Sequence, residues 1–231
     1  MLAIITAISG SGRKEYLKQF EEYSKKLGKR VKIYHVGEML FEQAAKANIN
    51  VTKENILNTN PHTLAALRAA VFEKILGELT ENQKKYDAVI LSVHAFFYWR
   101  KAFHRAYDRF YLAQTNPDLY FTLAGNEVTV KKELDARKQW NRERLTVREI
   151  SLWQNVEVET TASWADIMRK PFYVFAAGQP LGTLYKLLFM PHLEPVYISM
   201  PMTHLAGARA RIDAWAKKLE EYFVVFDPRT H

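Results

Sequence analysis

Seven short apolar runs, separated by helical patterns, constrain the fold of this chain most. Most of them are β-branched or aromatic and do not alternate with polar residues, which is typical of parallel strands covered on both faces. They span Leu2 to Ile8, Val31 to Tyr34, Ala88 to Val93, Leu119 to Leu123, Phe172 to Ala176, Val196 to Ser199 and Tyr222 to Phe226. The pattern predicts an α/β three-layer sandwich with a mainly parallel sheet.

Two helical segments bear on the site. A helix is predicted to begin at Asn60, because Pro61 suits a first helical position and apolar residues recur on one face. Those residues are Leu64, Leu67, Val71, Ile75 and Leu79. From Lys131 to Arg148 the sequence is strongly charged and predicts a helix that runs into a mobile connection.

The glycine-containing segment after the first strand predicts a phosphate-binding loop. It leads into a helical pattern at Tyr16 to Leu27, and it comprises Ser9, Gly10, Ser11, Gly12, Arg13, Lys14 and Glu15. Glycines let successive backbone N–H groups turn toward an anion, and a helix N-terminus adds partial positive charge. We expect these residues to bind ATP or another nucleotide. The alternative is a tight turn that needs glycine only for packing.

The loop departs from the standard pattern G-x-x-x-x-G-K-[ST]. Ala7 stands in place of the first glycine, Arg13 in place of lysine and Lys14 in place of the hydroxyl residue. Arginine binds phosphate well, but lysine cannot replace a hydroxyl as a Mg²⁺ ligand. Glu15 could assist with metal. No metal site is predicted, and whether Mg²⁺ is required stays open.

Several motifs, in order, resemble the archaeal-type adenylate kinases, which are P-loop nucleoside-monophosphate kinases. The motifs are Gly10 to Lys14, Tyr34-His35-Val36-Gly37-Glu38-Met39-Leu40-Phe41, Asn60-Pro61-His62-Thr63, Ser92-Val93-His94, and Arg137 with Asn141-Arg142-Glu143-Arg144. The resemblance covers about residues 1 to 180 and implies a P-loop fold with phosphoryl transfer from ATP to a nucleoside monophosphate.

Site roles follow from this resemblance position by position. It implies that Gly37 and Glu38 lie near the acceptor nucleotide and that His94 lies beside the phosphates. Arg13, Lys14 and His94 would then act in catalysis, and a lid would carry Arg137, Arg142 and Arg144. Ser92 replaces an aspartate of the family, and Lys14 replaces the loop hydroxyl. Two features that hold metal in the family are therefore missing, and catalytic activity stays open.

Simpler interpretations exist for these residues. His94 could cap a strand in a polar pocket, and the lid arginines could form a solvated helix face with i,i+4 partners. The aromatic and basic stretch Phe96 to Lys101, followed by His104, Arg105 and Arg109, could stack bases of a single strand. A helix that packs its aromatic residues on the sheet is favoured.

The C-terminal residues predict a βαβ unit, with a helix from about Ala208 to Glu221. We divide the chain into a kinase-like domain at residues 1–190 and an extension, or the start of a truncated second domain, at residues 195–231. The segments Val196 to His204 and Val224 to Pro228 resemble the start of nucleoside 2-deoxyribosyltransferases. Alternatively, the unit extends the first sheet.

Charge and composition limit the partners. The formal net charge of +8 favours anionic partners, including nucleotides and RNA. The chain lacks cysteine and any apolar run long enough to span a bilayer, which predicts a cytoplasmic protein without membrane contact. The oligomeric state stays open. A nucleotide-binding kinase-like enzyme is therefore expected, with a non-catalytic nucleotide sensor, an RNA-binding protein or part of a two-domain nucleotide-processing enzyme as alternatives.

Overall fold

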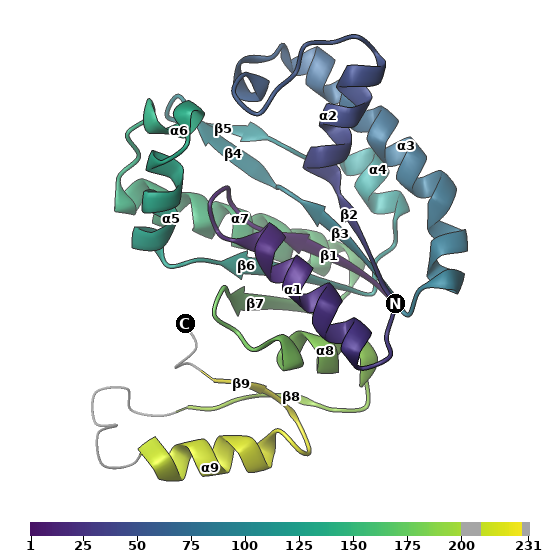
Figure 1. Ribbon diagram of the computed structural model, residues 1–231, viewed down its shortest axis with the longest axis vertical. Coiled ribbons are helices and arrows are strands. Elements are labelled where there is room, and N and C mark those ends of the chain that lie inside the picture. Colours follow the sequence, from purple (N-terminus) through teal and green to yellow (C-terminus); the bar gives the residue numbers. More distant parts are fainter. Residues whose placement is uncertain (200–208, 228–231) are drawn as a thin grey trace.

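The computed structural model describes residues 1–199 and 209–227 and contains a five-stranded parallel sheet between helical layers (Figure 1). The strand order is β2-β3-β1-β6-β7. The strands are β1 (Leu2–Thr6), β2 (Val31–His35), β3 (Ala88–Val93), β6 (Leu119–Ala124) and β7 (Phe172–Ala176). The predicted α/β fold with a parallel sheet is confirmed, and the sheet with a glycine loop after β1 has the architecture of a P-loop NTPase sandwich.

The helices cover both faces of this sheet. They are α1 (Arg13–Lys26), α2 (Val36–Lys46), α3 (Pro61–Lys85), α4 (Arg109–Gln114), α7 (Val147–Met168) and α8 (Leu181–Phe189), with a 3-10 turn η1 (Ile56–Asn58). On β1, Leu2 and Ile4 face the core shared with α2, α3, α4 and α7, whereas Ala3 and Ile5 face α1 and α8. Both sets of strand residues are buried, which explains the unalternated apolar runs.

The carboxyl ends of the central strands meet at one edge of the sheet. Thr6 at the end of β1 is in register with Val93 of β3 and with Thr122 of β6. Its hydroxyl group lies 2.7 Å from the Thr122 hydroxyl and 2.7 Å from that of Thr161. The loops that follow these strands therefore gather where ligands bind in open α/β sheets.

The helix predicted at Asn60 is present as α3. The Asn60 side chain accepts a hydrogen bond from the His62 amide at 2.9 Å, and Pro61 occupies the first position. Leu67, Val71 and other predicted residues of its apolar face are buried.

The stretch from Phe96 is not the packing helix that was predicted. It forms an antiparallel hairpin of β4 (Phe96–Trp99) and β5 (Ala102–Arg105), and α4 begins only at Arg109. Arg100 and Lys101 both have positive φ, as a two-residue hairpin turn requires. The aromatic side chains of β4 are buried or half-buried, so the expectation of packing holds while that of a helix fails.

The charged segment from Lys131 is also more ordered than the sequence indicates. It divides into α5 (Glu127–Asp135), α6 (Lys138–Asn141) and the start of α7. Trp140 and Leu145 are buried in a separate cluster with Trp99 and Trp153. The segment is therefore not a single helix followed by an irregular connection, and two apolar side chains among many charges pack it against the rest of the fold.

The C-terminal residues form a βαβ unit with its own sheet. β8 (Pro195–Tyr197) pairs in parallel with β9 (Val224–Phe226), and α9 (Arg209–Leu219) lies between them in sequence. These strands do not extend the five-stranded sheet among the residues described. The ring of Phe226 instead stacks on Tyr173 of β7 at 5.7 Å between centroids. Met200 to His204 and Pro228 lie outside the described residues.

Among the helices described, none is long and apolar enough to cross a bilayer.

Candidate functional site

The loop between β1 and α1 has the backbone of an anion-binding turn. Gly10 and Gly12 have φ values of 85° and 80°, which favour glycine. A side chain at Gly10 would come within 3.2 Å of the Val130 carbonyl oxygen on α5, whereas Gly12 has open space around it. Gly10 therefore allows the loop to pack closely against α5, whereas Gly12 is needed only for its backbone conformation.

The N-terminus of α1 offers hydrogen-bond donors to a ligand. The first amides of a helix have no intrahelical partner, and no side chain caps this one. The hydroxyl group of Ser11 is buried, with the residue 5% exposed, and has no hydrogen-bond partner among the described residues. An unpartnered buried donor at a helix N-terminus fits a phosphate group.

Arg13 turns inward from this loop. One guanidinium nitrogen, Nη1, donates to the Val93 carbonyl and to the Ala7 carbonyl, the latter at 3.3 Å. The other, Nη2, lies 3.0 Å from Nε2 of His94. Burial lowers the pKa of Arg13 to about 10, against the opposing charge of Glu157, so the group stays cationic at neutral pH.

Lys14 points outward and pairs with Glu38. This ion pair connects the start of α1 with the first turn of α2, and the two side chains are 70% and 42% exposed. The bond from Lys14 is the main cause that lowers the pKa of Glu38. The contact joins a residue of the predicted phosphate loop to a residue of the predicted acceptor site.

One cavity of about 800 Å³ brings most of the predicted site residues together. Its lining includes Ser9, Gly10, Ser11, Gly12, Arg13, Lys14, Glu15, Gly37, Glu38, His94 and Arg137. The motifs from four separate segments thus surround one space, which Phe41, Ile56, Leu57 and Phe97 line with apolar surface.

The other two predicted lid residues lie away from this cavity. Arg142 lines a neighbouring cavity of about 200 Å³ with Arg100 and Glu143. Arg144 lines neither cavity, is exposed and has a φ of 47°. Lys138 and Gln139, which the sequence analysis did not single out, line both cavities.

Glu157 is the buried acid that sequence reasoning missed. Its carboxylate lies at the segment that follows β3 and accepts hydrogen bonds from the Ala95 and Phe96 amides at 2.8 and 2.9 Å. Burial raises its pKa to about 7, although these amides and Arg13 lower it. Its signal in the sequence is its spacing. Glu157 lies four residues after Trp153 and four residues before Thr161, which places it on the buried face of α7.

His94 is also held in a low-polarity environment. Burial and the adjacent Arg13 charge lower its pKa well below the usual range, with a smaller effect of Arg137 and an opposing one of the Ala7 carbonyl. The Phe97 ring packs against the imidazole with centroids 4.7 Å apart. At neutral pH the imidazole is therefore uncharged.

Within residues 1–199 and 209–227, no three His, Asp or Glu side chains are grouped as metal ligands. Ser92 at the end of β3 is buried, and Lys14 pairs with a carboxylate. The donors present fit a phosphate ligand better than a bare divalent cation.

By sequence, the chain matches no protein-family model and no curated protein. By structure, it is similar to a shikimate kinase from Bacteroides thetaiotaomicron, with 12% identity over 81% of this chain and 98% of that one and a TM-score of 0.46. A gluconokinase from Sinorhizobium meliloti 1021 is 13% identical over 81% and 89%, with a TM-score of 0.38. A deoxyadenosine kinase from M. mycoides, with products dCMP and dCDP bound, is 16% identical over 83% and 98%, with a TM-score of 0.42. At these levels the likeness assigns neither activity nor substrate.

Proposed function

We propose that this chain is a nucleotide-binding P-loop phosphotransferase. ATP or another nucleotide would bind with its phosphates at the amides of Ser11 to Lys14, and a nucleoside monophosphate would bind beside Gly37 and Glu38. One observation carries the proposal: a single cavity joins the glycine loop, which holds the unpartnered Ser11 hydroxyl, to the first turn of α2.

Charge on the loop side of the cavity suits a phosphate chain. Lys14, Arg137 and Lys138 reach it from α1 and from the segment around α6. Phosphoryl transfer depends mainly on positioning and on neutralising charge over the transferred group. These three cations and the loop amides would position the phosphates and neutralise their charge.

Another part of the lining suits an aromatic base. Phe41, Ile56, Leu57 and Phe97 provide apolar surface, and Lys53 is a further cation of the lining. Aromatic and apolar surfaces favour stacking of a planar base. The acceptor in the proposal is therefore a nucleoside monophosphate whose base contacts this apolar surface.

Magnesium would reach this site with the nucleotide phosphates. The chain's own residues would orient those phosphates and hold the acceptor in line with them. Arg13 would hold the backbone after β1 through the Ala7 carbonyl, and Glu157 would hold the backbone after β3 through the Ala95 amide.

The test is product formation followed by ³¹P NMR. The protein is incubated with ATP, MgCl₂ and AMP, CMP, GMP or UMP in turn, and ADP with a nucleoside diphosphate is the expected product. Lys14→Ala should reduce the rate, whereas Lys18→Ala, which removes an exposed lysine of the same helix, should not. Absence of transfer to all four acceptors would contradict the kinase assignment.

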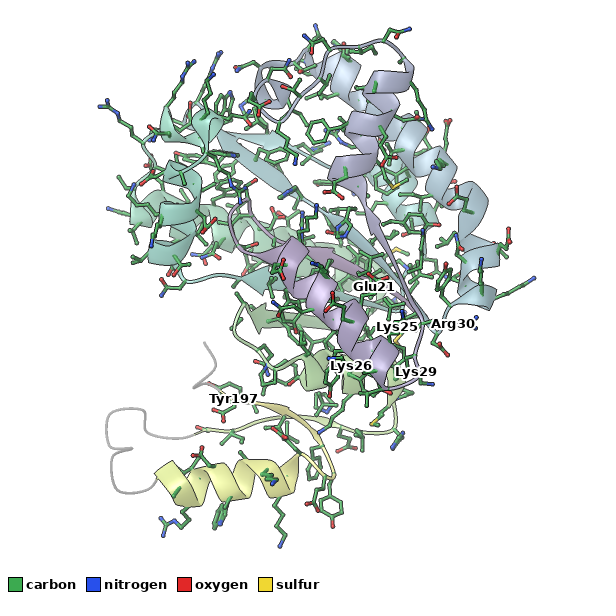
Figure 2. All side chains as sticks on the ribbon, viewed as in Figure 1. Glu21, Lys25, Lys26, Lys29, Arg30 and Tyr197 are labelled. Carbon is green, nitrogen blue, oxygen red and sulfur yellow. The ribbon has the colours of Figure 1, made fainter. Side chains whose placement is uncertain are left out.

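An RNA-binding function is the second candidate, favoured by a basic cluster at the end of α1. Figure 2 shows Lys25, Lys26, Lys29 and Arg30 close together there. Lys29 and Arg30 have Asp87 near them at 3.9 and 4.0 Å, so part of the charge is balanced. The phosphates of RNA would contact the cations of this cluster that Asp87 does not balance.

Salt dependence separates this candidate from the first. Binding of a labelled single-stranded RNA that contacts several phosphates should weaken steeply as salt rises. ATP bound in the cavity should respond much less. No RNA binding at low salt, or a flat response, would exclude this candidate.

A further inference from the structure

The side chains of Arg13 and His94 contact each other in the lining of the cavity. Nη2 of Arg13 lies 3.0 Å from Nε2 of His94. A guanidinium group carries five N–H donors and no acceptor, and it remains charged. Nε2 is therefore the acceptor in this hydrogen bond, which requires that it carry no proton. The Ala7 carbonyl, the other acceptor that acts on the ring, accepts from Nη1 of Arg13 at 3.3 Å.

The position of the histidine proton follows. Burial and the Arg13 charge disfavour a second proton on the ring, so the imidazole is neutral and holds one proton. With Nε2 unprotonated, that proton resides on Nδ1. The charged groups that act on the ring are Arg13 on α1 and Arg137 beyond α5, while Glu157 on α7 acts on Arg13.

Nδ1 of His94 has no hydrogen-bond partner among the described residues. His94 lines the same cavity as Ser11, whose hydroxyl group is likewise unpartnered. Buried donors without partners are rare in folded proteins and call for an explanation. Each of the two groups would gain a hydrogen-bond partner if a phosphate oxygen of the ligand reached it.

We infer that Arg13 fixes His94 in the neutral Nδ1–H tautomer, so that His94 donates a hydrogen bond to a phosphate oxygen of the bound nucleotide instead of acting as a general base. The phosphate part rests on the proposed function. Arg13 is then a positioning residue, because its guanidinium is occupied by His94 and by the carbonyls of Ala7 and Val93. This differs from a direct phosphate contact by Arg13.

The tautomer is tested on the protein without nucleotide. Long-range ¹H–¹⁵N NMR at neutral pH should show protonated Nδ1 and unprotonated Nε2 for His94. His94→Asn identifies the signals by their loss. Arg13→Lys keeps the charge but cannot donate to the carbonyls and to His94 through two separate nitrogens. It should therefore change the ratio of the Nδ1–H and Nε2–H tautomers of His94. A protonated Nε2 in the wild-type protein would overturn the inference.

The role as donor is tested by calorimetric titration with ATP. His94→Ala should weaken binding about 10-fold or more, as expected for one hydrogen bond to a charged group. His94→Asn retains an N–H donor near the position of Nδ1 and should recover most of that loss. His62→Ala, at an exposed position of α3, is the matched control and should bind as the wild type does.

The outcomes distinguish this inference from the proposed function. If the wild-type protein does not bind ATP, the proposed function and the donor role both fail, while the NMR result still decides the tautomer. If ATP binds and His94→Ala has unchanged affinity, the donor role alone is overturned.

Discussion

Oε1 of Glu157 accepts a hydrogen bond from the Ala95 amide at 2.8 Å, which ties the middle of α7 to the end of β3. The second oxygen of the same carboxylate accepts from the next amide, that of Phe96. This buried acid fixes the point where β3 leaves the sheet, directly after His94. The position of His94 in the cavity therefore depends on a helix far along the chain.

The ionisation of Glu157 should make stability depend on pH. Burial raises its pKa from an ordinary 4.5 to about 7. The stabilisation that the protonated carboxyl provides is fully present below about pH 4.5 and is lost as pH rises through about 7. The loss amounts to roughly 3 kcal/mol of unfolding free energy. Urea denaturation of wild type and Glu157→Gln at several pH values measures the difference between them.

The wild-type protein should lose stability relative to Glu157→Gln across that range. Glu159→Gln, an exposed change on the same helix, should follow the wild type. Parallel pH profiles for wild type and Glu157→Gln would show that Glu157 is not titrating in the folded protein.

Trp140 should be required for the stability of the segment around α6. It is 5% exposed and its ring lies 5.5 Å from Trp99 and 5.0 Å from Trp153 between centroids. Trp140→Ala should cost roughly 3–5 kcal/mol, measured by denaturant unfolding. Lys138→Ala on the same helix is the control, and a cost below about 0.5 kcal/mol for Trp140→Ala would support the mobile connection expected from sequence.

The Lys14–Glu38 pair should affect ligand binding more than stability. Because both side chains are largely exposed, Glu38→Gln should change the unfolding free energy by no more than about 1 kcal/mol. The freed Lys14 should then raise ATP affinity a few-fold, as measured by calorimetry. Glu42→Gln makes the same charge change elsewhere on α2, and an equal gain in that variant would mean that net charge alone is responsible.

Phe226 should hold the C-terminal βαβ unit against β7. Its ring contacts both Tyr173 and Phe175. Phe226→Ala should speed limited proteolysis between residues 190 and 195, the boundary that we propose between two domains. Tyr222→Ala, at a position that is 62% exposed, should leave the rate unchanged. Equal rates in the two variants would contradict this docking role.

The sequence predicted the sheet well because buried parallel strands have an unambiguous apolar pattern. Ala88 to Val93 and Phe172 to Ala176 have the predicted limits. It also placed the glycine loop correctly between β1 and α1. It misassigned the stretch from Phe96, since aromatic and basic residues suit a helix face and a hairpin equally, and the turn at Arg100 and Lys101 lacks glycine.

The candidate site was predicted in outline but not in its contacts. Motif order indicated that Gly37, Glu38 and His94 would gather near the loop, and the cavity contains all three. That Arg13 turns inward depends on carbonyls and on a buried acid from distant segments. Long-range contacts of this kind leave no local pattern in a sequence.

Nucleotide binding by the glycine loop is measured by calorimetric titration with ATP, ADP and AMP, with and without Mg²⁺, on wild type, Gly12→Val and Gly28→Val. Both glycines have positive φ, 80° and 76°, and open space around them, but only Gly12 belongs to the cavity. We expect micromolar ATP binding that Gly12→Val weakens at least about 10-fold and Gly28→Val leaves unchanged. Equal ATP affinity in all three proteins, or no binding of any nucleotide by the wild type, would contradict it.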